Sequence, residues 1–146
     1  MFVSPRSTRR ILTLLPFLFP LTACGPKPPR KQIDEQGQSV ASWAGTAELL
    51  ATAWLRGDVP TAYARQTLQS GAQQVEHARS SLAKVATGDS LAQAAVEAYG
   101  RLADRLTRMT AALQQDDRSF LEQSTDRLPS DAQRIRALRE HVRPGS

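Results

Sequence analysis

Cysteine and histidine are scarce in this chain, and their scarcity limits the chemistry that it can perform. Among 146 residues there are one cysteine, Cys24, and two histidines, His77 and His141. A single cysteine excludes an intramolecular disulfide, a Cys-x-x-Cys redox pair and a zinc site made of thiolates. Neither histidine has a histidine or a carboxylate four residues further on, as a helical metal pair requires. We therefore expect no metal ion and no cofactor.

Catalytic motifs are also lacking. The sequence contains neither a Gly-x-Ser-x-Gly nucleophile motif nor a glycine-rich phosphate-binding loop. The acidic residues Asp58, Asp116 and Asp117 stand between helical segments, where helix capping is their ordinary role. We therefore expect that the chain is not an enzyme.

The net charge of +5 is confined to the N-terminal part of the chain. Six basic residues precede residue 32, and no acidic residue does: Arg6, Arg9, Arg10, Lys27, Arg30 and Lys31. From residue 32 onward, 13 basic residues face 14 acidic ones. A basic protein often binds nucleic acid, but here the body of the chain is close to neutral. We expect no nucleic-acid partner.

A charge-free apolar run follows the basic N-terminal segment. Residues 11–22 read ILTLLPFLFPLT. At about 1.5 Å per helical residue they reach about 18 Å, short of a hydrocarbon core of about 30 Å. Pro16 and Pro20 also disfavour a regular helix. A basic segment followed by a short apolar run predicts a secretory signal peptide over residues 1–23.

The end of the apolar run resembles the lipobox of bacterial lipoproteins. Leu21, Thr22 and Ala23 precede Cys24, the only cysteine of the chain. The resemblance implies cleavage after Ala23 and attachment of diacylglycerol to the thiol of Cys24, which becomes the new N-terminus. Two or more acyl chains hold a protein firmly on a bilayer, whereas one binds only marginally.

The lipobox resemblance also predicts where in the cell the protein is located. The resemblance implies a bacterial cell envelope. In a Gram-negative host, Gly25 in place of an aspartate after the cysteine implies the outer membrane, facing the periplasm. Three prolines within residues 25–30 favour an extended path, so we interpret residues 24–38 as the acylated cysteine and a basic tether.

Amphipathic helical segments are predicted after the tether. Alanine, leucine, glutamine and arginine dominate, all of them good helix formers, and no period-2 alternation indicates a strand. The segments cover 39–56 with Ser39 as N-cap, 59–87, 91–115 with Ser90 and Gln93 as a capping box, and the stretch after Asp117. Short turns join them, so neighbours should run antiparallel. The expected fold is all-α, an up-down antiparallel four-helix bundle over residues 39–143.

Two positions within the helices stand out. Gly71 lies on an apolar stripe in which small and large residues alternate: Ala64, Leu68, Gly71, Val75, Ala78, Leu82 and Val85. A helical glycine costs about 1 kcal/mol relative to alanine, so we expect a neighbouring helix to approach closely at Gly71. Pro129 should break the fourth helix near residues 127–128, with Ser130 and Gln133 capping the second piece.

Two functional hypotheses remain open on the sequence. The first is a lipid-anchored helical domain that acts by protein contact in the envelope, as an accessory or interaction subunit. Its partners would be the membrane, through acylated Cys24, and an envelope protein. The second is a carrier of a small apolar ligand in a groove between helices, lined by Trp43, Trp54 and Tyr99. Filling the core is the ordinary role of such stripe residues.

Overall fold

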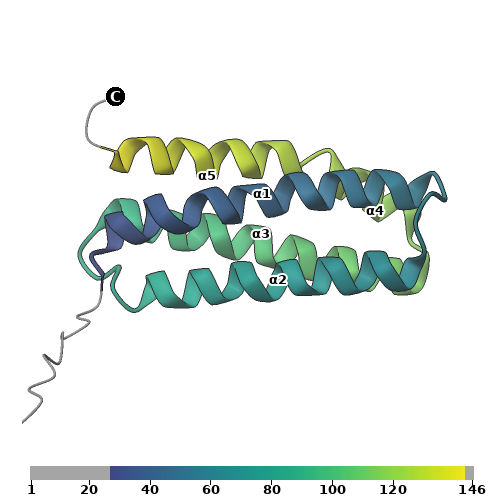
Figure 1. The fold of residues 1–146 in the computed structure, drawn as a ribbon, viewed down its shortest axis with the longest axis horizontal. Coiled ribbons are helices and arrows are strands. Elements are labelled where there is room, and N and C mark those ends of the chain that lie inside the picture. The colour runs from purple at the N-terminus through teal and green to yellow at the C-terminus, as the bar shows by residue number, and fades with distance from the viewer. Residues whose placement is uncertain (1–26, 144–146) are drawn as a thin grey trace, which may run out of the picture.

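The computed structural model describes residues 27–143, and this part of the chain forms helices and no strand (Figure 1). The helices are α1 (Pro29–Leu55), α2 (Thr61–Ala83), α3 (Ser90–Gln115), α4 (Arg118–Thr125) and α5 (Leu128–Val142). The all-α prediction is confirmed. The predicted signal peptide and the acylation site at Cys24 lie outside the described residues.

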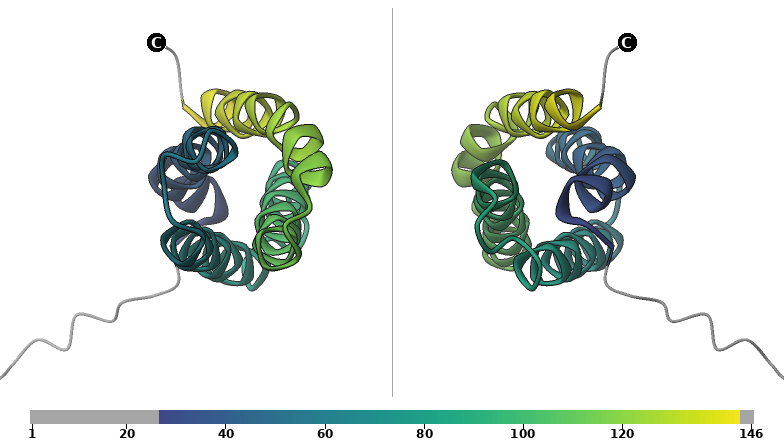
Figure 2. Two further views of the ribbon diagram at one scale, coloured as in Figure 1. Left: turned by 90° about the vertical axis from the view of Figure 1, so that its right-hand side faces the viewer. Right: turned by 90° about the vertical axis from the view of Figure 1, so that its left-hand side faces the viewer.

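The helices form a bundle, and two contacts show that α1 and α2 run in opposite directions. Trp54 on α1 bonds to Thr61 on α2, while Trp43 on α1 faces Gly71 on α2, so residue numbers rise in α1 as they fall in α2. Viewed end-on, α1, α2, α3 and the α4–α5 pair surround a common interior (Figure 2). That interior holds the apolar stripes.

The predicted stripes form the core. In α2, Ala64, Leu68, Val75 and Leu82 are buried together with Gly71. The largest fully buried side chains come from every helix: Tyr99, Ile33, Leu68, Leu82, Leu102, Leu106, Met109, Leu121, Leu128, Ile135 and Val75. The small residues of α1 and α2 let the helices approach, and the long side chains of α3 fill the space between them.

The expected tether is wrong over residues 29–38, because α1 begins at Pro29 rather than at residue 39. A proline at the start of a helix loses no hydrogen bond, since the first N–H groups have no intrahelical partner. Ile33 is 1% exposed, and with Gly37 and Val40 it extends the buried stripe toward the N-terminus. Ser39 therefore lies inside the helix and is not its N-cap.

Ion pairs fasten this first part of α1 to the last helix. Asp34 Oδ1 lies 3.2 Å from Nε of Arg139 on α5 and 2.8 Å from Nε of Arg143, which directly follows α5. Arg139 also donates to Gln38 Oε1 at 2.6 Å. Residues 29–38 are thus an integral part of the fold.

The turn between α2 and α3 begins earlier than expected. Helix α2 ends at Ala83 rather than at residue 87, and Gly88 adopts a left-handed φ of 81° in the turn. The N-cap of α3 is Asp89 rather than Ser90, since its carboxylate accepts from the backbone N–H groups of Leu91 and Ala92. Asp89 also pairs with Arg30 of α1.

The fourth helical segment is broken as expected, but the break falls at residues 126–127, slightly earlier than predicted. Helix α4 ends at Thr125, and α5 starts at Leu128 with Pro129 in its first turn. The proline therefore begins the second piece, where its missing N–H costs little. The N-cap of α5 is Arg127, so the capping box expected at Ser130 is not the start of the helix.

Candidate functional site

The predicted acylation site lies just ahead of the described fold. Only four residues separate Cys24 from Pro29, the first residue of α1. At 3.3–3.6 Å for each extended residue, the thiol-bearing residue stays within about 17 Å of the helix. Within residues 27–143, no helix combines the length and the apolar character that crossing a bilayer requires.

Trp43 lies in a groove between α1 and α2. Its indole ring packs on Gly71, and a Cβ added to that glycine would come within 2.6 Å of Trp43 Cε3. The indole Nε1 donates to Gln74 Oε1 at 3.3 Å. The groove holds about 510 Å³ and is lined mostly by polar side chains of both helices: Glu35, Gln36, Ser39, Val40, Trp43, Ser70, Gln73, Gln74, His77 and Ala78.

Trp54 lies at the C-terminal end of α1. It is buried, and its Nε1 donates to Thr61 Oγ1 at 2.9 Å. The guanidinium of Arg118 lies 5.1 Å from the centre of the indole ring and donates to the carbonyl of Leu55. Trp54 therefore joins the end of α1 to the start of α2 and to α4.

Tyr99 is enclosed in the interior at 1% exposure. Its hydroxyl has no hydrogen-bond partner among the described residues. Burial raises the pKa of Tyr99 to about 12, and the positive charge of Arg139 acts in the opposite direction. The phenol is therefore neutral at ordinary pH.

The three aromatic residues expected in one ligand groove do not come together. Only Trp43 lines a groove, while Trp54 and Tyr99 are buried at other places in the packed fold. Their positions on the stripes put all three toward the interior. The direction each ring takes there depends on which neighbouring helix it meets, and helical spacing does not specify that neighbour.

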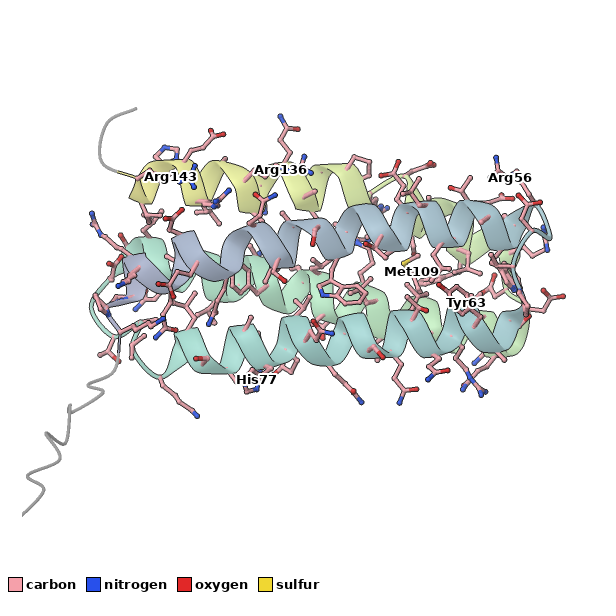
Figure 3. The ribbon with its side chains drawn as sticks, viewed as in Figure 1. Arg56, Tyr63, His77, Met109, Arg136 and Arg143 are labelled. Carbon is pink, nitrogen blue, oxygen red and sulfur yellow. The ribbon has the colours of Figure 1, made fainter. Side chains whose placement is uncertain are left out.

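A second groove, of about 840 Å³, runs between α2 and α3. Amides, hydroxyls and small apolar side chains line most of it: Gln69, Ala72, Gln73, Glu76, His77, Ser80, Ala103, Asp104, Thr107, Thr110, Ala111 and Gln114. Gln73 and His77 also line the first groove. These two residues form a ridge on α2 with a groove on each side, and Figure 3 shows His77 on the outer side of that helix.

The carboxylate of Glu76, beside this ridge, is held in its charged form. Arg79 donates to it through Nε and Nη2, both at 2.7 Å, and Ser80 Oγ donates at 3.1 Å. The hydrogen bond from Arg79 lowers the pKa of Glu76, and partial burial opposes that shift. Glu76 therefore serves as a hydrogen-bond acceptor.

Neither groove was predicted from the sequence. Their glutamine, serine and threonine side chains occur throughout solvent-exposed helices, and no motif distinguishes those that line a groove. His77 lies off the buried stripe of α2 and is exposed. Within residues 27–143, no three His, Cys, Asp or Glu side chains lie close enough together to bind a metal ion.

Comparisons with known proteins leave the structure as the basis for functional inference. No protein-family model, no curated protein and no solved structure matches this chain.

Proposed function

We propose that this protein is a lipoprotein of the bacterial cell envelope: an up-down four-helix bundle held on a membrane by acyl chains on Cys24. The observation that carries the proposal is the place of the only cysteine, directly after an apolar run and directly before the fold. In a Gram-negative host, Gly25 after the cysteine favours the outer membrane and a bundle facing the periplasm.

The proposed role is that of an accessory or interaction subunit. We place the partner contact on the α2 face, which we define as Gln73, His77 and the two grooves beside them. Half of the residues that line each groove carry amides or hydroxyls, the carboxylates there are Glu35, Glu76 and Asp104, and no lysine or arginine lines either groove. Amides and hydroxyls exchange water for a protein partner at a low desolvation cost, which suits a reversible contact.

Site-specific photo-crosslinking in living cells tests this role. We would place the crosslinking residue at Gln73 on the α2 face and, as a control, at Arg134, an exposed residue of α5. We expect one discrete protein adduct from Gln73 and none from Arg134. The same adduct from both positions, or none from either, would contradict the assignment of this face.

The carrier hypothesis finds less support. A carrier needs a cleft or cavity that encloses most of its apolar ligand, whereas both grooves here are open to solvent. Two of its three expected aromatic residues are packed elsewhere in the core. We therefore adopt the interaction subunit.

A further inference from the structure

Three segments that are far apart in the sequence meet at one end of the bundle (Figure 1). They are the start of α1, the turn between α2 and α3, and the end of α5. Arg30 Nε on α1 lies 3.3 Å from Asp89 Oδ2 in the turn, and Arg143 Nε after α5 lies 2.8 Å from Asp34 Oδ1 on α1. We call this region the basic end.

Cationic side chains outnumber carboxylates at the basic end. The cations are Lys27, Arg30, Lys31, Lys84, Arg139 and Arg143, and the carboxylates are Asp34, Glu35, Asp89 and Glu140. The opposite end, made of the turns at 56–60 and 116–118, carries two arginines and three aspartates. The basic end therefore carries the clearer excess of positive charge.

Three of the four carboxylates of the basic end have cationic or N–H partners: Asp34, Glu35 and Asp89. The hydrogen bond from Arg143 lowers the pKa of Asp34. The N–H of Ala92, together with Arg30, lowers the pKa of Asp89. Both groups are therefore charged at neutral pH. Lys27 Nζ lies 2.7 Å from Glu35 Oε2, and Lys31 Nζ lies 4.0 Å from Glu35 Oε1.

All three lysines of the chain belong to the basic end: Lys27, Lys31 and Lys84. The side chains of Lys27 and Lys31 are 57% and 61% exposed, and Lys84 is exposed. A lysine ammonium is a compact charge on a flexible stem, so it meets a phosphate without requiring a fixed geometry. The cations elsewhere in the chain are arginines.

The predicted anchor adjoins this same end. Three residues lead from Cys24 to Lys27, a distance of at most about 11 Å at full extension. Helix α1 then continues for 27 residues, or about 40 Å. A bilayer that holds Cys24 is therefore close to the basic end, and the opposite end can stand far from it.

Resting on the lipid anchor proposed above, we propose that the basic end is a docking surface for anionic lipid headgroups and that the bundle stands upright on the bilayer. Anionic lipids give a membrane a negative surface potential that attracts lysine and arginine within about a Debye length, roughly 10 Å at moderate salt. Lys84 is the critical residue for testing the proposal. It is far from Cys24 in sequence, so only the fold can bring it close to the bilayer surface.

Amine footprinting on vesicles tests the proposal. The acylated protein is purified from bacterial membranes and reconstituted either in phosphatidylcholine or in phosphatidylcholine mixed with phosphatidylglycerol. An amine-reactive reagent then labels the lysines, and mass spectrometry gives the rate at each one. We expect Lys84 to react several-fold more slowly on the anionic vesicles, with recovery in high salt.

A matched control places a lysine at the other end. Arg56 is exposed and lies at the end of the bundle opposite Arg143, as Figure 3 shows. In the Arg56→Lys variant, the new lysine should react equally fast on both kinds of vesicle. Equal rates at Lys84 on both vesicles would overturn the docking surface, and protection of both ends would overturn the upright orientation.

A separate measurement shows whether Cys24 carries the proposed lipid anchor. If mass spectrometry finds no lipid on Cys24, the proposed function fails and the thiol is free. That thiol is then coupled to a maleimide-bearing lipid, and the footprinting is repeated on the tethered chain. Lys84 protection in this arm supports the docking surface without biological acylation, and its absence rejects it.

Discussion

At the scale of single residues, Gly71 controls how closely α1 and α2 approach. The indole of Trp43 occupies the space that a side chain at Gly71 would need, with Cε3 only 2.6 Å from the place of a Cβ. A helical glycine costs about 1 kcal/mol, and burial of an indole against it offsets that cost. Gly45, on the same helix as Trp43, has nothing within 4 Å of an added Cβ.

Substitutions at these two glycines should have opposite effects. Gly71→Leu should displace Trp43 and lower the free energy of unfolding by about 1–3 kcal/mol, as overpacking does. Gly45→Ala should raise it by up to about 1 kcal/mol, because alanine favours the helix and meets open space. Thermal melting followed by circular dichroism checks both. A Tm for Gly71→Leu at or above that of the unmodified chain would place Gly71 at the surface.

The hydroxyl of Tyr99 is a single group that lowers the stability of the fold. It is buried without a hydrogen-bond partner, and an unpaired buried polar group costs about 1–3 kcal/mol. Burial also raises its pKa to about 12. The folded protein therefore holds the phenolic proton more tightly than the unfolded chain, in which tyrosine titrates near pH 10. This contribution is complete below about pH 10 and is lost as the pH rises through about 12.

Tyr99→Phe should therefore change both stability and its pH dependence. At neutral pH we expect the variant to be more stable by about 1 kcal/mol, since it removes the unpaired hydroxyl. Between about pH 10 and about pH 12, the unmodified chain should lose stability that the variant retains. Urea unfolding at a series of pH values measures both effects. Parallel loss in the two chains over that range would show that Tyr99 does not titrate there.

At the scale of elements, the first three turns of α1 contribute more to the stability of the fold than their polar sequence suggests. Ile33 is almost fully buried, and Asp34 pairs with Arg139 of α5 and with Arg143, which directly follows that helix. Full burial of an isoleucine side chain contributes about 1.5–3 kcal/mol. The segment is thus a principal contact between the first and last helices.

Truncation tests this role of α1. A chain that starts at residue 27 should melt cooperatively, and a chain that starts at residue 39 should be unfolded or melt at a much lower temperature. Within the longer chain, Ile33→Ala should cost about 2–5 kcal/mol, while Ser42→Ala on the exposed side of α1 should cost little. Equal Tm values for the two lengths would mean that residues 29–38 are dispensable.

The sequence predicted the interiors of the helices better than their ends. Stripes such as Leu68, Val75 and Leu82 mark the buried side because helical periodicity alone determines it. The start of α1 was missed because Ile33 is the only large apolar residue in a polar, proline-rich stretch. The cap of α3 was assigned to Ser90, but Asp89 lies where its carboxylate also reaches Arg30, a contact made by tertiary structure.

The candidate site was less predictable for the same reason. Helical spacing places Trp43, Trp54 and Tyr99 toward the interior but does not say which helix each one meets. The grooves beside Gln73 and His77 arise from the separation of helix axes, which depends on small residues such as Gly71 and on the packing of all neighbours. Cys24 was singled out by a local motif, which needs no tertiary contact.

At the scale of the whole molecule, a short proposed anchor precedes a long helical bundle. The basic end adjoins Cys24, and the helices extend from it for about 40 Å. An α2 face on the side of an upright bundle would be presented to envelope proteins above the bilayer surface. All of this depends on acylation of the single cysteine.

The most direct test is the mass of the protein isolated from bacterial membranes. The account predicts that the N-terminal peptide of the chain begins at Cys24 and carries acyl chains. It also predicts that Cys24→Ser leaves the protein without lipid and outside the detergent phase on phase separation. A Cys24→Ser protein that still carries lipid and partitions into detergent, or a native chain with a free Cys24 thiol, would contradict the account.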